Sequence, residues 1–262
     1  MKNITYSRKE IKSKLDELYF RYNKRIFVHP DPLELLYSYT RIEDREIAGL
    51  IASSLAYGRV AQILKSAGRI LEILGPSPYR YLMGSELDYL KQSFAGFKHR
   101  FTIGDEVACL LYAVRSMIKN SGSLNNAFLS GYRKEDPDMI SALLKFCKNI
   151  SILSNDSCRS LIPSYLGRSA FKRLNLYLRW MVRNDKVDPG GWSGLPPSKL
   201  LIPLDTHMHR ISRSLGLTSR RQADIKTVVE ITDSFKIIEK NDPVKYDFVL
   251  TRIGMNRLYG EF

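Results

Sequence analysis

The segment LIPLDTHMHRI, residues 201–211, contains an apolar run that gives way to a helical pattern at its aspartate. Asp205 is a strong N-cap candidate, because a carboxylate there can accept a hydrogen bond from a free backbone amide of the first turn. Gly216 is suited to end the helix, which is therefore predicted over 206–215. The helix dipole stabilises a negative charge at this end, so Asp205 is expected to stay ionised at neutral pH.

A second helix and a long loop precede this segment. The sequence predicts a turn at 163–169 and then a helix over 170–183, whose apolar residues recur on one face. The loop DPGGWSGLPP, residues 188–197, cannot form regular structure, since its glycines and prolines interrupt the hydrogen bonding of helices and strands. Ser169 is the expected N-cap of the helix, and it places Lys172 in the first turn.

Lys172 therefore faces the positive end of the helix dipole, and Arg168 and Arg173 add positive charge beside it. An amine in such surroundings loses its proton more readily than a free lysine, which suits it to nucleophilic attack and imine formation. Each of the two charged residues also has an ordinary structural interpretation. Lys172 taken alone fits a solvated surface lysine, and Asp205 taken alone fits a helix cap.

The rest of the chain also has helical spacing of its apolar residues, and no alternating strand pattern of useful length occurs. Ser7 with Glu10 forms a capping box for the first helix, and Asp136 and Asp242, each followed by proline, are expected caps further on. The fold class is predicted to be all-α. The further helices are expected near 10–18, 44–55, 60–74, 105–119, 137–153, 222–235 and 243–255.

The composition favours a polyanionic partner. Lysine and arginine number 41 against 27 acidic residues in 262, and the surplus of +14 is spread along the whole chain. Nucleic acid is the partner that such a charge favours, although an acidic membrane surface would also fit it. The chain has no stretch of eighteen apolar residues, and its first residues lack the apolar run of a signal peptide. We expect a cytoplasmic, nucleoid-associated monomer that does not bind membranes.

The cysteines predict neither disulfides nor a metal site. Cys109, Cys147 and Cys158 are odd in number and widely spaced, and they lie in largely apolar helical patterns. No cysteine and histidine spacing fits zinc, and His207 and His209 lie two positions apart, which places them on different faces of a helix. We therefore expect reduced core thiols, no metal and no cofactor.

Residues 201–211 resemble the catalytic aspartate segment of the helix-hairpin-helix, GPD-type DNA glycosylase superfamily, in which an apolar run, an Asp-Thr-His and a nearby arginine recur. Residues 167–170, followed by a helix, resemble the hairpin that leads into the lysine-bearing helix of that superfamily. Residues 47–57 are similar to its early helix. The resemblance spans about 40–255 and implies one domain, 1–262, built as a two-lobed helical bundle with a helix-hairpin-helix motif. One lobe would cover about 40–155, and the other about 156–262.

The resemblance implies base excision from double-stranded DNA that carries a damaged base. The target nucleotide would be flipped into a pocket between the lobes. Lys172 would attack C1′ of the sugar, and Asp205 would stabilise the positive charge that develops there. The imine could then undergo β-elimination and nick the strand. Within this resemblance Gly167, Arg168 and Ser169 would hold a backbone phosphate, and Tyr57 and Arg59 could fill or probe the gap left by the flipped base. His207 would hydrogen-bond near the capped turn, and Trp180 and Trp192 could line a base pocket by stacking. Tyr57 and Trp180 also fit ordinary packing roles.

Two differences from the family pattern limit which branch of the superfamily the chain resembles. Lys172 and Asp205 are 33 positions apart (205 minus 172), which is longer than in endonuclease III and similar to the archaeal 8-oxoguanine glycosylases. An oxidised purine is therefore the favoured substrate. The second difference is that the cysteines of an iron–sulfur cluster are missing. The sequence as a whole also resembles an uncharacterised bacterial group of the superfamily. Two alternatives remain, a non-catalytic DNA- or RNA-binding protein of the same fold and a monofunctional glycosylase in which Asp205 activates water.

Overall fold

The computed structural model describes residues 8–167 and 169–255, and two of its helices, α3 and α10, lie almost where the sequence predicts them. Helix α3 covers Val60–Leu74, as predicted, and ends at Gly75, whose φ of 69° suits a residue without a Cβ atom. Helix α10 covers Thr206–Ser214 and is capped by Asp205, which accepts a hydrogen bond of 2.7 Å from the amide of Met208. The all-α fold class is confirmed.

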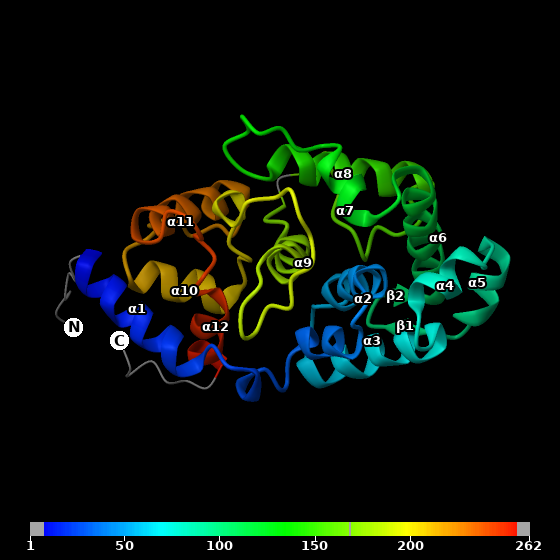
Figure 1. Cartoon of the computed structure of the whole chain (residues 1–262), viewed down its shortest axis with the longest axis horizontal. Helices are drawn as coiled ribbons and strands as arrows, with labels where there is room; N and C mark the ends of the chain where they lie inside the picture. Colours follow the sequence, from blue (N-terminus) through cyan, green and yellow to red (C-terminus); the bar gives the residue numbers. More distant parts are fainter. Residues whose placement is uncertain (1–7, 168, 256–262) are drawn as a thin grey trace.

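The described residues form a series of helices with one very short hairpin, shown in Figure 1. In chain order the elements are α1 (Arg8–Tyr22), η1 (Arg25–Phe27), η2 (Pro32–Ser38), α2 (Ile42–Ser54), α3 (Val60–Leu74), α4 (Pro78–Met83), α5 (Leu87–Ser93), β1 (Lys98–His99), β2 (Thr102–Ile103), α6 (Gly104–Ser121), α7 (Leu124–Leu129), α8 (Ile140–Leu153), α9 (Lys172–Val182), η3 (Pro197–Lys199), α10 (Thr206–Ser214), α11 (Ile225–Ile238) and α12 (Asp247–Met255).

Two helices start later than their aspartate-proline pairs predict. Helix α8 begins at Ile140, because Asp136 accepts from the amide of Arg133 in a preceding turn, and Asp138 instead accepts from the amide of Ile140 at 2.8 Å. Helix α12 begins at Asp247, and Asp242 accepts from Nε of Arg183 at 2.9 Å. In both cases the carboxylate has found a partner outside the helix it was expected to cap. The expected box at Ser7 lies outside the described residues.

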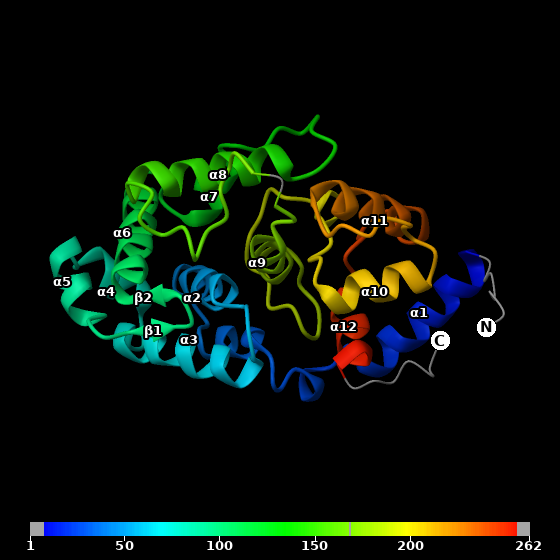
Figure 2. The ribbon, with the colours of Figure 1, turned by 180° about the vertical axis from the view of Figure 1, so that it is seen from behind.

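The helices gather into two lobes with α9 between them, as Figures 1 and 2 show from opposite sides. Helices α2 to α8 form one lobe, which we call the helical lobe. Helices α10, α11 and α12 form the other, the C-terminal lobe, and α1 packs against it. Lys245 and Tyr246 both donate to Asp16 of α1, at 2.9 and 2.7 Å. The C-terminal lobe is thus completed by the N-terminal helix, a contribution that the expected boundary at 156 omits.

The loop after α9 closes the end of that helix. The amides of Gly190 and Trp192 donate to the carbonyls of Trp180 and Met181, at 3.0 and 2.8 Å, so they satisfy acceptors that the last turn leaves free. Gly191 has a φ of 124°, and a Cβ atom there would lie 2.1 Å from the side chain of Ile42. Glycine is therefore required where the loop passes against the start of α2.

A buried ion network joins α9 to this loop and to α12. Asp188 is fully buried and pairs with Arg179 of α9 and with Arg183, the residue that follows the helix. Arg179 also pairs with Asp247 of α12, and Arg183 pairs with Asp242. Charges this deeply buried are tolerated only when they are matched and hydrogen-bonded, so the network fixes the relative position of the three segments.

The segment between α8 and α9 is irregular. Residues 154–171 form a series of turns, and Arg168 lies outside the described residues. The helix-hairpin-helix motif therefore stays a prediction. Among the described residues no helix is both long and apolar enough to cross a membrane. The three cysteines are buried and unpaired.

Replacing Asp188 with alanine should cost about 3–5 kcal/mol of unfolding free energy, because two buried guanidinium groups would lose a partner. Denaturant unfolding monitored by circular dichroism measures this cost. The exposed pair of Arg41 and Glu43 supplies the control, and Glu43→Ala should change the stability by less than about 0.5 kcal/mol. Equal effects of the two substitutions would contradict a structural role for the network.

Candidate functional site

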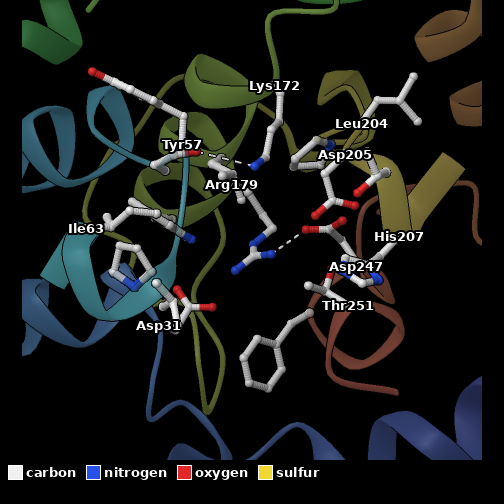
Figure 3. Close-up of a pocket in the computed structure, with 18 of the residues that line it drawn as sticks. Asp31, Tyr57, Ile63, Lys172, Arg179, Leu204, Asp205, His207, Asp247 and Thr251 are labelled. Carbon is white, nitrogen blue, oxygen red and sulfur yellow. Dashed lines mark hydrogen bonds and ion pairs between the residues drawn. The ribbon is translucent and has the colours of Figure 1, made fainter. Parts of the chain in front are cut away.

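A pocket of about 620 Å³ lies between the two lobes and is drawn in Figure 3. Its walls come from five parts of the chain that are distant in sequence. These are the segment 30–32, the turn 56–58 with the start of α3, one face of α9, the residues 203–209 around the start of α10, and α12. Ala223, just before α11, also lines the pocket. The size falls within the range of small-molecule and cofactor sites, which is about 300–1,000 Å³.

Helix α9 contributes one continuous face to the pocket. Lys172, Leu176, Arg179 and Trp180 line it, at the i, i+4, i+7 and i+8 spacing that keeps side chains on the same side of a helix. Lysine occupies the open end of this face, and the paired Arg179 lies deeper. The helix thereby presents an amine, an apolar strip and an ion pair to the same cavity.

Lys172 is the first residue of α9, as the expected first-turn position requires. The residue before it, Phe171, has a φ of 49° and sharply redirects the chain into the helix. Ser169 does not cap the helix, which corrects the prediction, because its Oγ accepts from the amide of Phe171 at 3.1 Å. The Lys172 amine is half-buried, and its hydrogen bond within the described part of the chain is to the carbonyl of Ala56, at 3.4 Å.

Asp205 reaches the same pocket from the start of α10. One of its oxygens caps the helix, and Figure 3 shows its carboxylate beside that of Asp247. Burial raises the pKa of Asp247 to about 6, the guanidinium of Arg179 opposes this rise, and the charge of Asp205 adds to it. The helix starts at Lys172 and Asp205 therefore bring an amine and a carboxylate to one cavity, although 33 positions separate them in the sequence.

Two buried nitrogen atoms of the pocket residues lack hydrogen-bond partners among the described residues. They are Nε1 of Trp180 and Nδ1 of His207. A buried polar group without a partner is costly, so such atoms are candidates for binding a ligand. His209 also lines the pocket, but its Nε2 is within 3.0 Å of the carbonyl of Arg220. Within the described residues no group of three or more histidine, cysteine or acidic side chains could hold a metal ion.

Tyr57 lines the rim of the pocket, and its ring is fixed on several sides. Its hydroxyl lies 3.1 Å from the carbonyl of His99 and 2.6 Å from Oγ1 of Thr102. The guanidinium of Arg173 lies 5.3 Å from the centre of its ring. Burial lowers the pKa of Arg173, and its guanidinium donates to two backbone carbonyls of the helical lobe. Tyr57 is therefore a fixed part of the wall.

The remaining expected DNA contacts lie outside the main pocket. Arg59 is exposed in the N-cap position of α3, and Gly167 is exposed in the turns before α9. Arg168 is outside the described residues. Ser169 lines a neighbouring hollow of about 370 Å³, which shares Tyr57 and Lys172 with the main pocket. The two hollows thus meet at the lysine.

Trp192 is not a pocket residue, and the expectation that it lines a base pocket is wrong. Its indole is buried against Tyr177 and Phe128, with ring centres 5.1 and 5.8 Å away. Its Nε1 donates to Glu46 at 3.0 Å, and the same carboxylate accepts from the amide of Leu124 at the start of α7. A glycine-rich loop suggested an accessible tryptophan, but the loop folds back and buries it.

Residues 31–256 match the model of a family described as proteins of unknown function, DUF2400. The chain belongs to the DUF2400 family. The matched region runs from Asp31 of the pocket wall through α12, so it contains both Lys172 and Asp205. No curated protein and no solved structure matches the chain.

In this DUF2400 chain, sequence reasoning missed Arg179 and Asp247 as pocket residues. Arg179 follows Lys172 by seven positions, so helical spacing from the lysine contained the signal. Asp247 carried no such signal, because its helix was expected to start four residues earlier. Asp31, which also lines the pocket, was missed as well, and it pairs with Arg252 of α12.

The capping and charge roles of Asp205 can be separated. Asparagine caps a helix about as well as aspartate, so Asp205→Asn should change the unfolding free energy by only a few tenths of a kcal/mol, whereas Asp205→Ala should cost about 1 kcal/mol. Thermal and denaturant unfolding measure both. Asp224, the N-cap of α11, lines none of the pockets described above and is the matched control. An Asp205→Asn protein as unstable as Asp205→Ala would contradict the simple capping role.

Proposed function

We propose that the protein is a DNA glycosylase with an associated lyase activity, which removes a damaged base from double-stranded DNA through an imine formed by Lys172. The observation that supports this proposal best is the shared pocket of Lys172 and Asp205. An amine and a carboxylate at the starts of two helices border a cavity large enough for an extruded nucleotide.

The charge of the chain agrees with a nucleic-acid partner. Its surplus of +14 gives the electrostatic attraction on which DNA binding depends. The turns before α9 and the hollow beside Lys172 offer a path for the sugar-phosphate backbone next to the pocket. The start of α9 carries free amides and the positive end of a helix dipole, which favour a phosphate nearby. Gly167 and Ser169 belong to this path, and Arg168 would add charge to it.

The proposed reaction balances at the sugar. The amine of Lys172 forms a bond to C1′ as the bond between C1′ and the base breaks, and the base leaves with the bonding electrons and takes up a proton. The amine then loses a proton, the ring oxygen leaves C1′ and is protonated, and an imine remains. Loss of a proton from C2′ expels the 3′ phosphate and nicks the strand.

In this reaction Asp205 would stabilise positive charge electrostatically. Its carboxylate is held by the first turn of α10, so it can face positive charge at C1′ without reorganising when the base leaves. The Arg179 and Asp247 pair lies beside it and contributes fixed charges of both signs to the pocket. A preorganised arrangement of this kind stabilises the transition state more effectively than mobile water.

The base would be read at the buried end of the pocket. Nε1 of Trp180 is a donor, so it suits a carbonyl or ring nitrogen of a purine, and Nδ1 of His207 is a second polar contact. An oxidised purine such as 8-oxoguanine is the favoured substrate of this proposal.

Covalent trapping tests the imine. With borohydride present, the protein should form a stable band on duplexes that carry 8-oxoguanine or an abasic site, and Lys172→Gln should abolish the band while DNA binding persists. Lys226 is the matched control, because it also lies in the first turn of a helix, α11, but is exposed outside the pocket. Lys226→Gln should trap as well as the unchanged protein.

The result also separates the alternatives. Base release that survives Lys172→Gln would indicate a monofunctional glycosylase that depends on Asp205. Tight binding with neither trapping nor base release on any lesion would favour a non-catalytic binding protein. In both cases the lyase proposal would be rejected.

The proposed role of Trp180 in reading the base predicts that its substitution affects two substrates differently. Trp180→Phe removes the indole donor, so excision of 8-oxoguanine should fall by about tenfold, the loss expected for one good hydrogen bond. Trapping on an abasic duplex should be unchanged, because that substrate has no base to recognise. Single-turnover assays on both duplexes give the comparison. An equal loss on both would show that the substitution disturbs Lys172 instead.

A further inference from the structure

The hairpin of β1 and β2 ends in an exposed aromatic side chain at the rim of the pocket. The two strands pair through Lys98 with Ile103 and His99 with Thr102, so Arg100 and Phe101 form the tip. Phe101 is 65% exposed. Its ring stacks on that of Tyr57, with centres 5.1 Å apart and planes 10° from parallel. The Phe101 ring therefore extends outward the part of the pocket wall that Tyr57 forms.

The hairpin is anchored firmly beneath this tip. His99 is buried, with Nδ1 2.9 Å from Oγ of Ser66 and Nε2 3.2 Å from the carbonyl of Tyr57. Its ring also meets the Tyr57 ring edge-on, at 4.7 Å. Tyr57 in turn bonds to the carbonyl of His99 and to Thr102. Phe101 is consequently held at a fixed place relative to the pocket.

At the tip, Arg100 adopts a backbone conformation that is more usual for glycine. Arg100 has a φ of 55°, at the first of the two turn residues. A side chain there costs free energy that glycine would avoid, and such positions cluster at functional sites. The Arg100 side chain lies across Gly58, since a Cβ atom on that glycine would be 3.1 Å from the guanidinium. Gly58 itself lines the pocket, so the charge is placed at its mouth.

The surroundings of Phe101 are cationic. Arg100 lies against Gly58 of the pocket, Arg59 next to that glycine and Lys98 in strand β1 are exposed, and Arg173 lies over the Tyr57 ring. An exposed aromatic ring among cations matches the chemistry of a nucleic acid, in which bases stack on rings and phosphates bind cations. An apolar protein partner would gain nothing from these charges. In Figure 1 the hairpin belongs to the helical lobe, where β1 contacts α3 and β2 contacts α6.

We infer that Phe101 enters the DNA duplex and stacks on the bases exposed when a nucleotide leaves the helix, while Arg100 binds an adjacent phosphate. This inference rests on the proposed function, because it requires a DNA partner with an extruded nucleotide. It assigns the insertion role to Phe101 and not to Tyr57, whose hydroxyl and ring are already held by the hairpin and Arg173. Inserted apolar side chains partly unstack a base step and fill the gap.

Binding of two duplexes by the full chain tests this role. One duplex is undamaged, and the other carries tetrahydrofuran, a stable abasic analogue that leaves a gap in the stack. Phe101→Ala should weaken binding of the gapped duplex by about tenfold, the loss expected for one stacked base, and should affect the undamaged duplex much less. Phe20, which is 81% exposed on α1, is the control, and Phe20→Ala should change neither affinity.

A tryptophan at the same place gives a direct signal. Phe101→Trp should keep the affinity for the gapped duplex, and the added fluorescence should be quenched on binding because the indole stacks on a base. Phe20→Trp should show no such quenching. Equal binding of the gapped duplex by the unchanged and Phe101→Ala proteins, or an unquenched Phe101→Trp, would overturn the inference and leave the glycosylase proposal intact.

Two further outcomes separate the possible failures. An unchanged protein that binds neither duplex at low salt would reject the proposed function, and this inference with it. A shift from dimer to monomer on Phe101→Ala, with DNA affinity retained, would identify the ring as a contact between copies of the chain and would overturn its role in DNA.

Discussion

The position of one buried carboxylate constrains the whole molecule. Asp188 is buried between Arg179 and Arg183, and these two arginines extend the network to α12 and to Asp242. Such a group is stabilising only when every member is present, since removing one leaves the others unmatched in a medium of low polarity. The direction of α9, the path of the glycine-rich loop and the position of α12 are therefore set together.

This constraint also explains why the candidate site can be precise. Arg179 belongs at once to the network and to the pocket, so the face of α9 that carries Lys172 cannot rotate without breaking buried ion pairs. Asp205 is fixed independently by the first turn of α10. An amine and a carboxylate on separate rigid helices keep their relative geometry better than the same groups on loops.

The sequence predicted features that depend on neighbouring residues. It did not predict features that depend on contacts between residues far apart in the chain. Helix α3 was predicted to the residue, because its apolar spacing and its terminal glycine act within the helix itself. The start of α12 was misplaced and Trp192 was misassigned, because Asp242 and the indole bind Arg183 and Glu46, which are distant in sequence. Lys172 and Asp205 were paired by resemblance alone. Phe101 could not be identified from the sequence, since its exposure depends on the pairing of the two short strands β1 and β2.

The docking of α1 has a consequence for how the chain folds. Asp16 and Tyr246 meet although 230 positions separate them, so the C-terminal lobe cannot be completed until residues up to Tyr246 have left the ribosome. Helix α1 is therefore made long before the segment against which it packs. During that interval its apolar residues Ile11, Leu15 and Leu18, which are buried in the folded protein, are uncovered, and transiently exposed apolar surface of this kind favours aggregation.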